Sequence, residues 1–151
     1  MFQDDLKAGE RLERYILNKI QQGQSPLLGD AFPDAYKIEG YFKEYDIYIP
    51  SIGLGIEVKQ DKKSQHTGNY LIEIEFDGKP SALSTTKANY WVFHDGECEI
   101  WTTPSRIKQA IKGLPIREFI GNGDTKYKKA YLCPKEKIKN TAEYILYEIY
   151  G

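Results

Sequence analysis

Apolar residues recur at helical spacing near the start of the chain. Residues 4–22 contain no proline, and a set of apolar side chains falls on one broad arc of a helical wheel: Leu6, Leu12, Tyr15, Ile16 and Ile20. Side chains at positions i, i+3, i+4 and i+7 share a face in an α-helix. The pattern therefore predicts an amphipathic helix over these residues, with the arc turned toward the core.

Two acidic residues of this helix differ in their position relative to the apolar arc. Glu13 falls inside the arc, whereas Glu10 lies at its edge beside Leu17. We expect Glu10 to be solvated. Glu13 either faces the interior, where a buried acid needs a partner, or pairs in solvent with a neighbour, Arg14 or Lys19.

Two short apolar runs, residues 45–49 and 56–59, are joined by a turn that contains two glycines. Their alternation of apolar and polar positions predicts two strands, and the turn predicts that they pair as an antiparallel hairpin. Glu57 and Lys59 then share one face of the second strand, and its apolar residues share the other. In this hairpin Asp46 can lie beside Glu57.

Two carboxylates and one ammonium at the end of a small sheet suit a divalent cation. Mg²⁺ keeps several waters, so Asp46 and Glu57 suffice together with phosphate oxygens and water. A bound cation lowers the pKa of water and stabilises a leaving oxygen, while Lys59 orients the attacking water. The alternative is a merely solvated strand face, but the flanking isoleucines indicate a buried sheet, where unpaired charge is costly. The pattern predicts phosphodiester hydrolysis.

The rest of the chain adds further elements. In chain order, the predicted elements are strands over residues 71–76, 90–93 and 99–102, the last two forming a hairpin around a turn at 94–97, and a helix over 104–112. Residues 141–150 fit a helix or a strand, and the helix is favoured. Residues 121–124 predict a mobile loop, and His66 and His94 are expected in loops. The order of elements indicates an α/β protein.

The hairpin motif resembles the signature of the PD-(D/E)xK nuclease superfamily, which includes archaeal Holliday-junction resolvases, restriction enzymes and phage endonucleases. That signature is an aspartate, a hairpin and then Glu-x-Lys, matching Asp46, Glu57 and Lys59. Tyr45 stands where the signature has proline, a departure that the superfamily tolerates. The resemblance implies a restriction-endonuclease-like core, with a central mixed β-sheet flanked by helices. It also implies a Mg²⁺ cofactor, for which Mn²⁺ substitutes.

Resolvases of this superfamily carry a first-helix glutamate that reaches the metal site, in a Gly-x-x-x-Glu-Arg context. Residues 9–14 fit that context and select Glu13. The resemblance therefore implies metal ligation by Asp46, Glu57 and Glu13. Residues 44–93 are also similar to phage-type proteins of the superfamily, which implies Glu73 as an accessory acid, although alternation leaves Glu75 open. The expected catalytic residues are Asp46, Glu57, Lys59, Glu13 and Glu73.

The same likeness implies DNA contacts from hydroxyl, amide and ammonium groups. The residues concerned are Thr67, Asn69, Ser81, Thr86 and Lys87, and Lys62 and Lys63 directly follow the motif. Taken singly, each is also an ordinary turn or cap residue. More lysines crowd residues 126–139, where Tyr127 and Tyr131 could stack on bases, although solubility explains a lysine run equally well.

Composition and charge set broader limits. The net charge of -1 and the pI near 6.2 exclude a generally basic nucleic-acid coat protein. At 151 residues, without a linker or a repeat, the chain is expected to form a single domain over residues 1–151. Cys98 and Cys133 have no metal-binding spacing and predict buried, reduced thiols. No signal peptide or membrane span is indicated, so we expect a cytoplasmic protein of a bacterial, archaeal or phage-infected cell.

Together these features predict a Mg²⁺-dependent endonuclease that hydrolyses DNA phosphodiester bonds. Branched DNA such as a Holliday junction is one candidate substrate, and single strands and flaps are others. A homodimer is expected on the resemblance alone. The alternative is a non-catalytic DNA-binding or assembly module that keeps a nuclease fold, against which the full Asp, Glu and Lys set argues.

Overall fold

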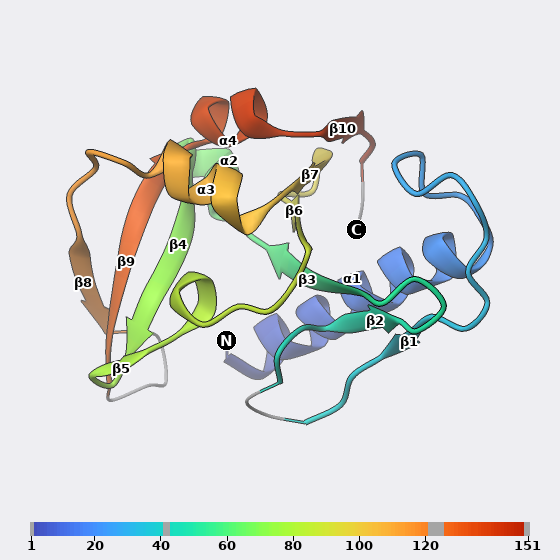
Figure 1. The fold of residues 1–151 in the computed structure, drawn as a ribbon. Helices are drawn as coiled ribbons and strands as arrows, with labels where there is room; N and C mark the ends of the chain where they lie inside the picture. The colour runs from blue at the N-terminus through green and yellow to red at the C-terminus, as the bar shows by residue number, and fades with distance from the viewer. Residues whose placement is uncertain (1, 41–42, 121–125, 150–151) are drawn as a thin grey trace.

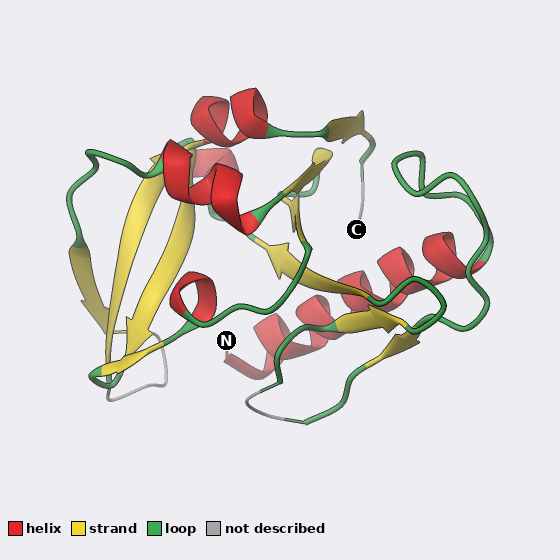
Figure 2. Ribbon diagram, in the orientation of Figure 1, coloured by secondary structure: helices red, strands yellow, loops and turns green. Residues whose placement is uncertain are grey.

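A computed structural model describes residues 2–40, 43–120 and 126–149, with side chains from residue 7 onward. Figure 1 traces the chain and Figure 2 marks its secondary structure. The helices are α1 (Phe2–Gln21), α2 (Ser64–Thr67), α3 (Pro104–Ala110) and α4 (Lys135–Thr141), with a 3₁₀ turn η1 (Ala82–Ser84). The strands are β1 (Tyr36–Lys37), β2 (Ile47–Ile49), β3 (Leu54–Gln60), β4 (Asn69–Phe76), β5 (Lys79–Pro80), β6 (Tyr90–His94), β7 (Cys98–Thr102), β8 (Arg117–Ile120), β9 (Tyr127–Pro134) and β10 (Tyr144–Tyr147).

The strands form two sheets. The first sheet has the order β1-β2-β3-β6-β7-β10 and is mixed, because β3 and β6 run parallel while its other neighbours are antiparallel. The second sheet has the order β5-β4-β9-β8 and is antiparallel throughout. The predicted α/β class with a mixed sheet and helices is therefore confirmed. None of the helices in the described ranges is both long and apolar enough to cross a membrane.

The helix α1 covers one face of the first sheet beside the β2–β3 hairpin (Figure 1). Its apolar arc, including Leu12, Ile16 and Ile20, packs on a cluster from the strands that contains Ile56 and Trp101. The three helix side chains are at most 1 % exposed, and burying each stabilises the fold by about 2 kcal/mol. The predicted amphipathic helix is thus present, and its position fixes where Glu13 can reach.

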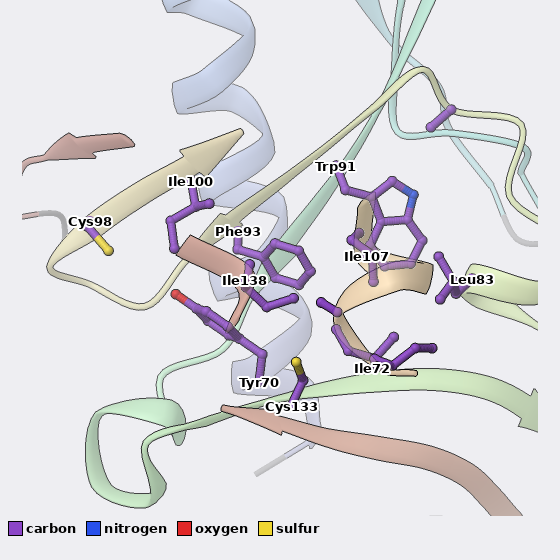
Figure 3. Close-up of a cluster of buried hydrophobic side chains, with 13 residues drawn as sticks. Tyr70, Ile72, Leu83, Trp91, Phe93, Cys98, Ile100, Ile107, Cys133 and Ile138 are labelled. Carbon is purple, nitrogen blue, oxygen red and sulfur yellow. The ribbon is translucent and has the colours of Figure 1, made fainter. Parts of the chain in front are cut away.

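The opposite face of the first sheet meets the second sheet and the helices α3 and α4. Figure 3 shows this second cluster, in which the rings of Tyr70 of β4 and Phe93 of β6 contact each other and lie among side chains of the two helices. Trp91 of β6 belongs to the same cluster. Cys98 and Cys133 are both free and buried there, as the prediction of buried thiols requires.

Two buried polar networks tie the layers together. Lys19 of α1 places its Nζ 3.0 Å from Glu99 Oε1 of β7, and the Trp101 indole donates to Glu99 Oε2 at 2.7 Å. Asp95, in the turn after β6, lies 2.5 Å from Lys135 Nζ and accepts hydrogen bonds from Tyr70 and from backbone amides. These networks join elements far apart in the sequence, and no local pattern predicts either of them.

Most predicted elements are confirmed, and three predictions are wrong. His66 lies in the short helix α2 and not in a loop. The favoured helix over 141–150 is replaced, across Tyr144–Tyr147, by the strand β10, because the exposed edge of β7 supplies backbone partners in register. His94 is the last residue of β6 and is 1 % exposed, so it is not a loop residue. The predicted loop at residues 121–124 lies outside the described residues.

Candidate functional site

The β2–β3 hairpin holds Asp46 through its backbone. In the hairpin register Ile47 opposes Ile56, so Asp46 precedes β2 opposite Glu57. The Asp46 amide donates to the Ile56 carbonyl at 2.9 Å, and Asp46 Oδ2 accepts from the Val58 amide at 2.7 Å. Asp46 is only 5 % exposed. The predicted pairing of this aspartate with the second strand is confirmed, and one of its carboxylate oxygens is already engaged by backbone.

Glu57 and Lys59 share the face of β3 opposite to the buried Ile56 and Val58, as strand alternation predicts. Lys59 Nζ lies 3.3 Å from Glu57 Oε2. Burial raises the pKa of Glu57 to about 7, against the opposing effect of Lys59, and the nearby charge of Asp46 adds to the increase. A carboxyl with a pKa near neutrality is typical of a functional site rather than of a solvated strand.

The ammonium of Lys59 is placed by a tryptophan as well as by a carboxylate. Its Nζ lies 5.4 Å from the centre of the Trp91 ring, and the Trp91 indole donates to Thr86 Oγ1 at 3.1 Å. Burial works against the charged form of Lys59, but the charges of Glu57 and Asp46 outweigh it and raise its pKa. Lys59 therefore stays protonated at neutral pH.

Glu13 is the acid of α1 that faces this cluster. It lies 3.4 Å from Lys37 Nζ and 3.6 Å from Lys43 Nζ, so the alternative of a solvent pair with Arg14 or Lys19 is wrong. Burial and the charge of Asp46 raise the pKa of Glu13, and the charges of the two lysines offset only part of this increase. Glu13 Oε2 is fully buried and accepts no hydrogen bond from the described residues. Glu10, by contrast, is exposed.

Lys43 stands among the carboxylates, and sequence reasoning missed it. Its Nζ lies 3.0 Å from Asp46 Oδ1, on the oxygen that the backbone leaves open. Burial disfavours its charge, but the charges of Asp46, Glu13 and Glu57 together raise its pKa. The only signal in the sequence was a lysine three residues before Asp46. Lys37, equally missed, sits on β1, whose pairing with β2 no motif reveals.

The donor set suits a hard divalent cation in its chemistry, since Asp46, Glu57 and Glu13 are all carboxylates whose charges act on the same ammonium, that of Lys43. They do not converge tightly. Within the described ranges no three His, Cys, Asp or Glu side chains are gathered closely enough to hold a metal ion by themselves. Ammonium groups lie between the acids instead, so the arrangement is an alternating cluster of charges.

Glu73 lies near the cluster without joining it. Its Oε2 accepts a hydrogen bond from Ser81 Oγ at 2.8 Å, and its Oε1 lies 3.9 Å from Lys128 Nζ. Its charge contributes to the raised pKa of Lys59. Glu75 pairs instead with Lys129 at 3.5 Å, beyond a register shift in β4. Of the two acids that alternation left open, Glu73 is the one coupled to the site.

The residues predicted to contact DNA fall into two groups. Lys62, Lys63 and Lys87 are exposed and available to a partner. Three others use their side chains within the fold: Thr67 Oγ1 accepts from the backbone amide of Asn69 at 3.1 Å, Ser81 binds Glu73, and Thr86 Oγ1 accepts from the Ala88 amide at 3.2 Å as well as from Trp91. Asn69, the remaining residue, takes part through its backbone. For this group the structure displays turn and positioning roles.

Comparison with known proteins adds no assignment. No protein-family model matches the sequence, and neither the curated proteins nor the solved structures give a significant match. The functional argument therefore rests on the residues and their geometry.

Proposed function

We propose that this chain is a divalent-cation-dependent endonuclease that hydrolyses DNA phosphodiester bonds, acting in the cytoplasm. The observation that carries the proposal is the convergence of Asp46, Glu57 and Lys59 on one end of a hairpin, with Glu13 brought to them by α1. A restriction-endonuclease-like core is part of the proposal. It is supported by a mixed sheet that carries the hairpin next to a parallel strand and is covered by the first helix.

In this proposal each residue has a separate task. Asp46 and Glu57 would hold Mg²⁺ or Mn²⁺, with Glu13 as a third acidic ligand. When bound, the cation supplies a water of lowered pKa and neutralises charge on the phosphate. Lys59 orients the attacking water and stabilises the phosphoryl oxygens as negative charge develops on them.

The residues around this set position it. The Val58 amide fixes the orientation of the Asp46 carboxylate, and Trp91 keeps the Lys59 ammonium over its ring. Glu73 acts as an accessory acid through its charge on Lys59. Lys62, Lys63 and Lys87 are proposed contacts to DNA phosphates, with the four polar residues predicted beside them acting mainly in positioning.

One observation favours a second candidate function. The acids are neutralised by lysines, and the described residues contain no ready-made group of three metal ligands. A non-catalytic DNA-binding or assembly module that retains a nuclease fold would have such a charge-balanced cluster. The two candidates differ in whether the cluster binds a cation and breaks a phosphodiester bond.

A cleavage panel tests the proposal. Purified protein is incubated with linear duplex, single-stranded, flap and four-way-junction DNA, in Mg²⁺, in Mn²⁺ and in EDTA. The variants Glu57→Gln and Lys59→Ala are compared with Glu75→Ala, which removes a carboxylate of β4 that pairs with Lys129. Cutting that needs the cation, falls roughly 100-fold or more in the first two variants and persists in the third is the expected result.

The panel also identifies the substrate. Preferential cutting of the four-way junction would fit a symmetric homodimer that places two sites on one junction, which sedimentation of the protein–DNA complex checks. DNA binding without cutting of any substrate would favour the non-catalytic module. Cleavage by Glu57→Gln at the parental rate would show that this carboxylate has no part in the reaction.

A further inference from the structure

The position of Lys43 sets it apart from the other lysines of the site. Asp46 has two carboxylate oxygens, and Oδ2 is taken by the Val58 amide at 2.7 Å. Oδ1 is the oxygen left for another ligand, and Lys43 Nζ occupies it at 3.0 Å. The same ammonium lies 3.6 Å from Glu13 Oε1, so it bridges an acid of the hairpin and an acid of the first helix.

This bridge relieves repulsion that the acids would otherwise exert on one another. The Asp46 and Glu13 carboxylates are 7 % and 12 % exposed, so water screens their negative charges poorly. The negative charge of Glu57 also favours the protonated form of the Lys43 ammonium. Lys43 therefore helps to balance three partly buried acids, together with Lys37 at Glu13 and Lys59 at Glu57, in the region where a divalent cation would do so more strongly.

A second observation shows that Lys43 satisfies the cluster only in part. Glu13 Oε2 is fully buried and receives no hydrogen bond from the described residues, although Lys37 Nζ lies 3.4 Å away. Lys37 is thus the ion-pair partner of this oxygen, and its contact is long for a hydrogen bond. The lysines balance the charge of Glu13 at both of its oxygens without holding them tightly.

We propose that Lys43 is an internal counter-ion that occupies the cation position of the acidic cluster and is displaced when a divalent cation binds, so that it sets the threshold cation concentration of the site. The inference rests on the proposed function. The Lys43 side chain is 24 % exposed and its aliphatic stem is flexible, so its ammonium can move to the surface. There it is placed to meet the phosphates of a DNA substrate, which couples cation binding to DNA binding.

Lys43→Met tests this, because methionine keeps most of the aliphatic stem and removes the charge. Lys37→Met is the matched control: it removes the same charge from the same cluster, but Lys37 contacts Glu13 and Glu39 and not Asp46. Affinity for Mn²⁺ and Mg²⁺ is measured by calorimetry without DNA. We expect Lys43→Met to bind the cation on the order of tenfold more tightly than the parent, and Lys37→Met to gain roughly threefold or less. If Lys43→Met is unfolded without cation, the cation concentration that restores its melting transition replaces the calorimetric value.

The outcomes separate this inference from the proposed function. Equal affinity gains in the two variants, or none in either while the parent binds and cuts, would overturn the counter-ion role and leave the nuclease intact. Tighter binding by Lys43→Met alone, without DNA cleavage by any form, would support the counter-ion and remove the nuclease. Failure of all three proteins to bind either cation would overturn both. A Mn²⁺-soaked crystal in which Lys43 Nζ still contacts Asp46 beside the bound ion would also refute displacement.

Discussion

The buried pair of Lys19 and Glu99 offers the sharpest test of how the first helix is held. The Lys19 ammonium lies 3.0 Å from a carboxylate whose side chain is 1 % exposed. Replacing Lys19 with methionine keeps the packing of the stem but leaves Glu99 as an uncompensated buried charge. The Trp101 indole still donates to Glu99 at 2.7 Å, so one partner remains.

Removing one partner of a buried ion pair lowers the free energy of unfolding by about 3–5 kcal/mol, because the charge that remains is buried away from water and no longer has an opposite charge beside it. For a domain of this size that loss lowers the melting temperature by roughly 10 °C. The substitution of Lys19 should also affect the candidate site. Lys19 anchors the helix that carries Glu13, so under the proposed function the variant should reach half-maximal cation binding at a higher concentration than the parent.

Urea unfolding followed by circular dichroism measures the cost. The control is Lys129→Met, which breaks the more exposed pair with Glu75 and should cost less than about 1 kcal/mol. The double variant Lys19→Met/Glu99→Gln removes the stranded charge and keeps an acceptor for Trp101, so it should recover about 2 kcal/mol relative to Lys19→Met alone. A Lys19→Met loss no larger than that of the control would refute the anchoring argument.

Three further predictions concern acid stability, the hairpin and DNA contact. Burial opposes ionisation of Asp95, but Lys135 and the amides of Glu97 and Cys98 outweigh it and lower the pKa from 3.8 to about 2. Because the pKa of Asp95 is lower in the folded protein, its ionised carboxylate stabilises the fold above about pH 4, and this contribution is lost as the pH falls toward 2. The contribution amounts to about 2 kcal/mol. In urea unfolding between pH 2 and 5, the parent should lose this free energy of unfolding and Asp95→Asn should show no corresponding loss. Gly55→Ala places a Cβ 2.5 Å from the Tyr45 ring beside Asp46 and should lower the free energy of unfolding by about 1–3 kcal/mol in thermal melts. The control Gly9→Ala meets nothing within 4 Å and should stabilise its helix by up to about 1 kcal/mol. Equal effects of the two variants would contradict the crowding at Gly55. In the Glu57→Gln background, Lys62→Ala/Lys63→Ala should weaken DNA binding and reduce the slope of log affinity against log salt by about 2, and an unchanged slope in anisotropy titrations would exclude phosphate contact by these lysines.

The parts of the site that the sequence predicted share a physical cause. Strand alternation has a period of two, so Glu57 and Lys59 had to share a face once Ile56 and Val58 were buried. The short turn after Pro50 then leaves an antiparallel pairing as the natural way to bring Asp46 beside Glu57. Helical periodicity in the same way distinguished Glu13 from Glu10. Each of these relations depends on neighbours within about a dozen residues.

The errors have an equally physical cause. Residues 144–147 carry apolar and aromatic side chains that suit a helix or a strand, and the choice was made by unpaired backbone groups of β7. Lys37 and Lys43 looked like ordinary surface lysines. They became part of the cluster because β1 pairs with β2 and α1 packs beneath the hairpin.

The sequence by itself determined the amphipathic first helix, the acid-bearing hairpin and the α/β class, because local periodicity and turn chemistry specify the individual elements. Tertiary structure alone decided that a lysine stands between the acids, that Lys19 is paired with Glu99 across 80 positions, and that Glu75 pairs with Lys129 while the charge of Glu73 acts on Lys59. The reason is that electrostatic interactions depend on distance and burial in three dimensions. Those quantities are set only when elements far apart in the chain pack together.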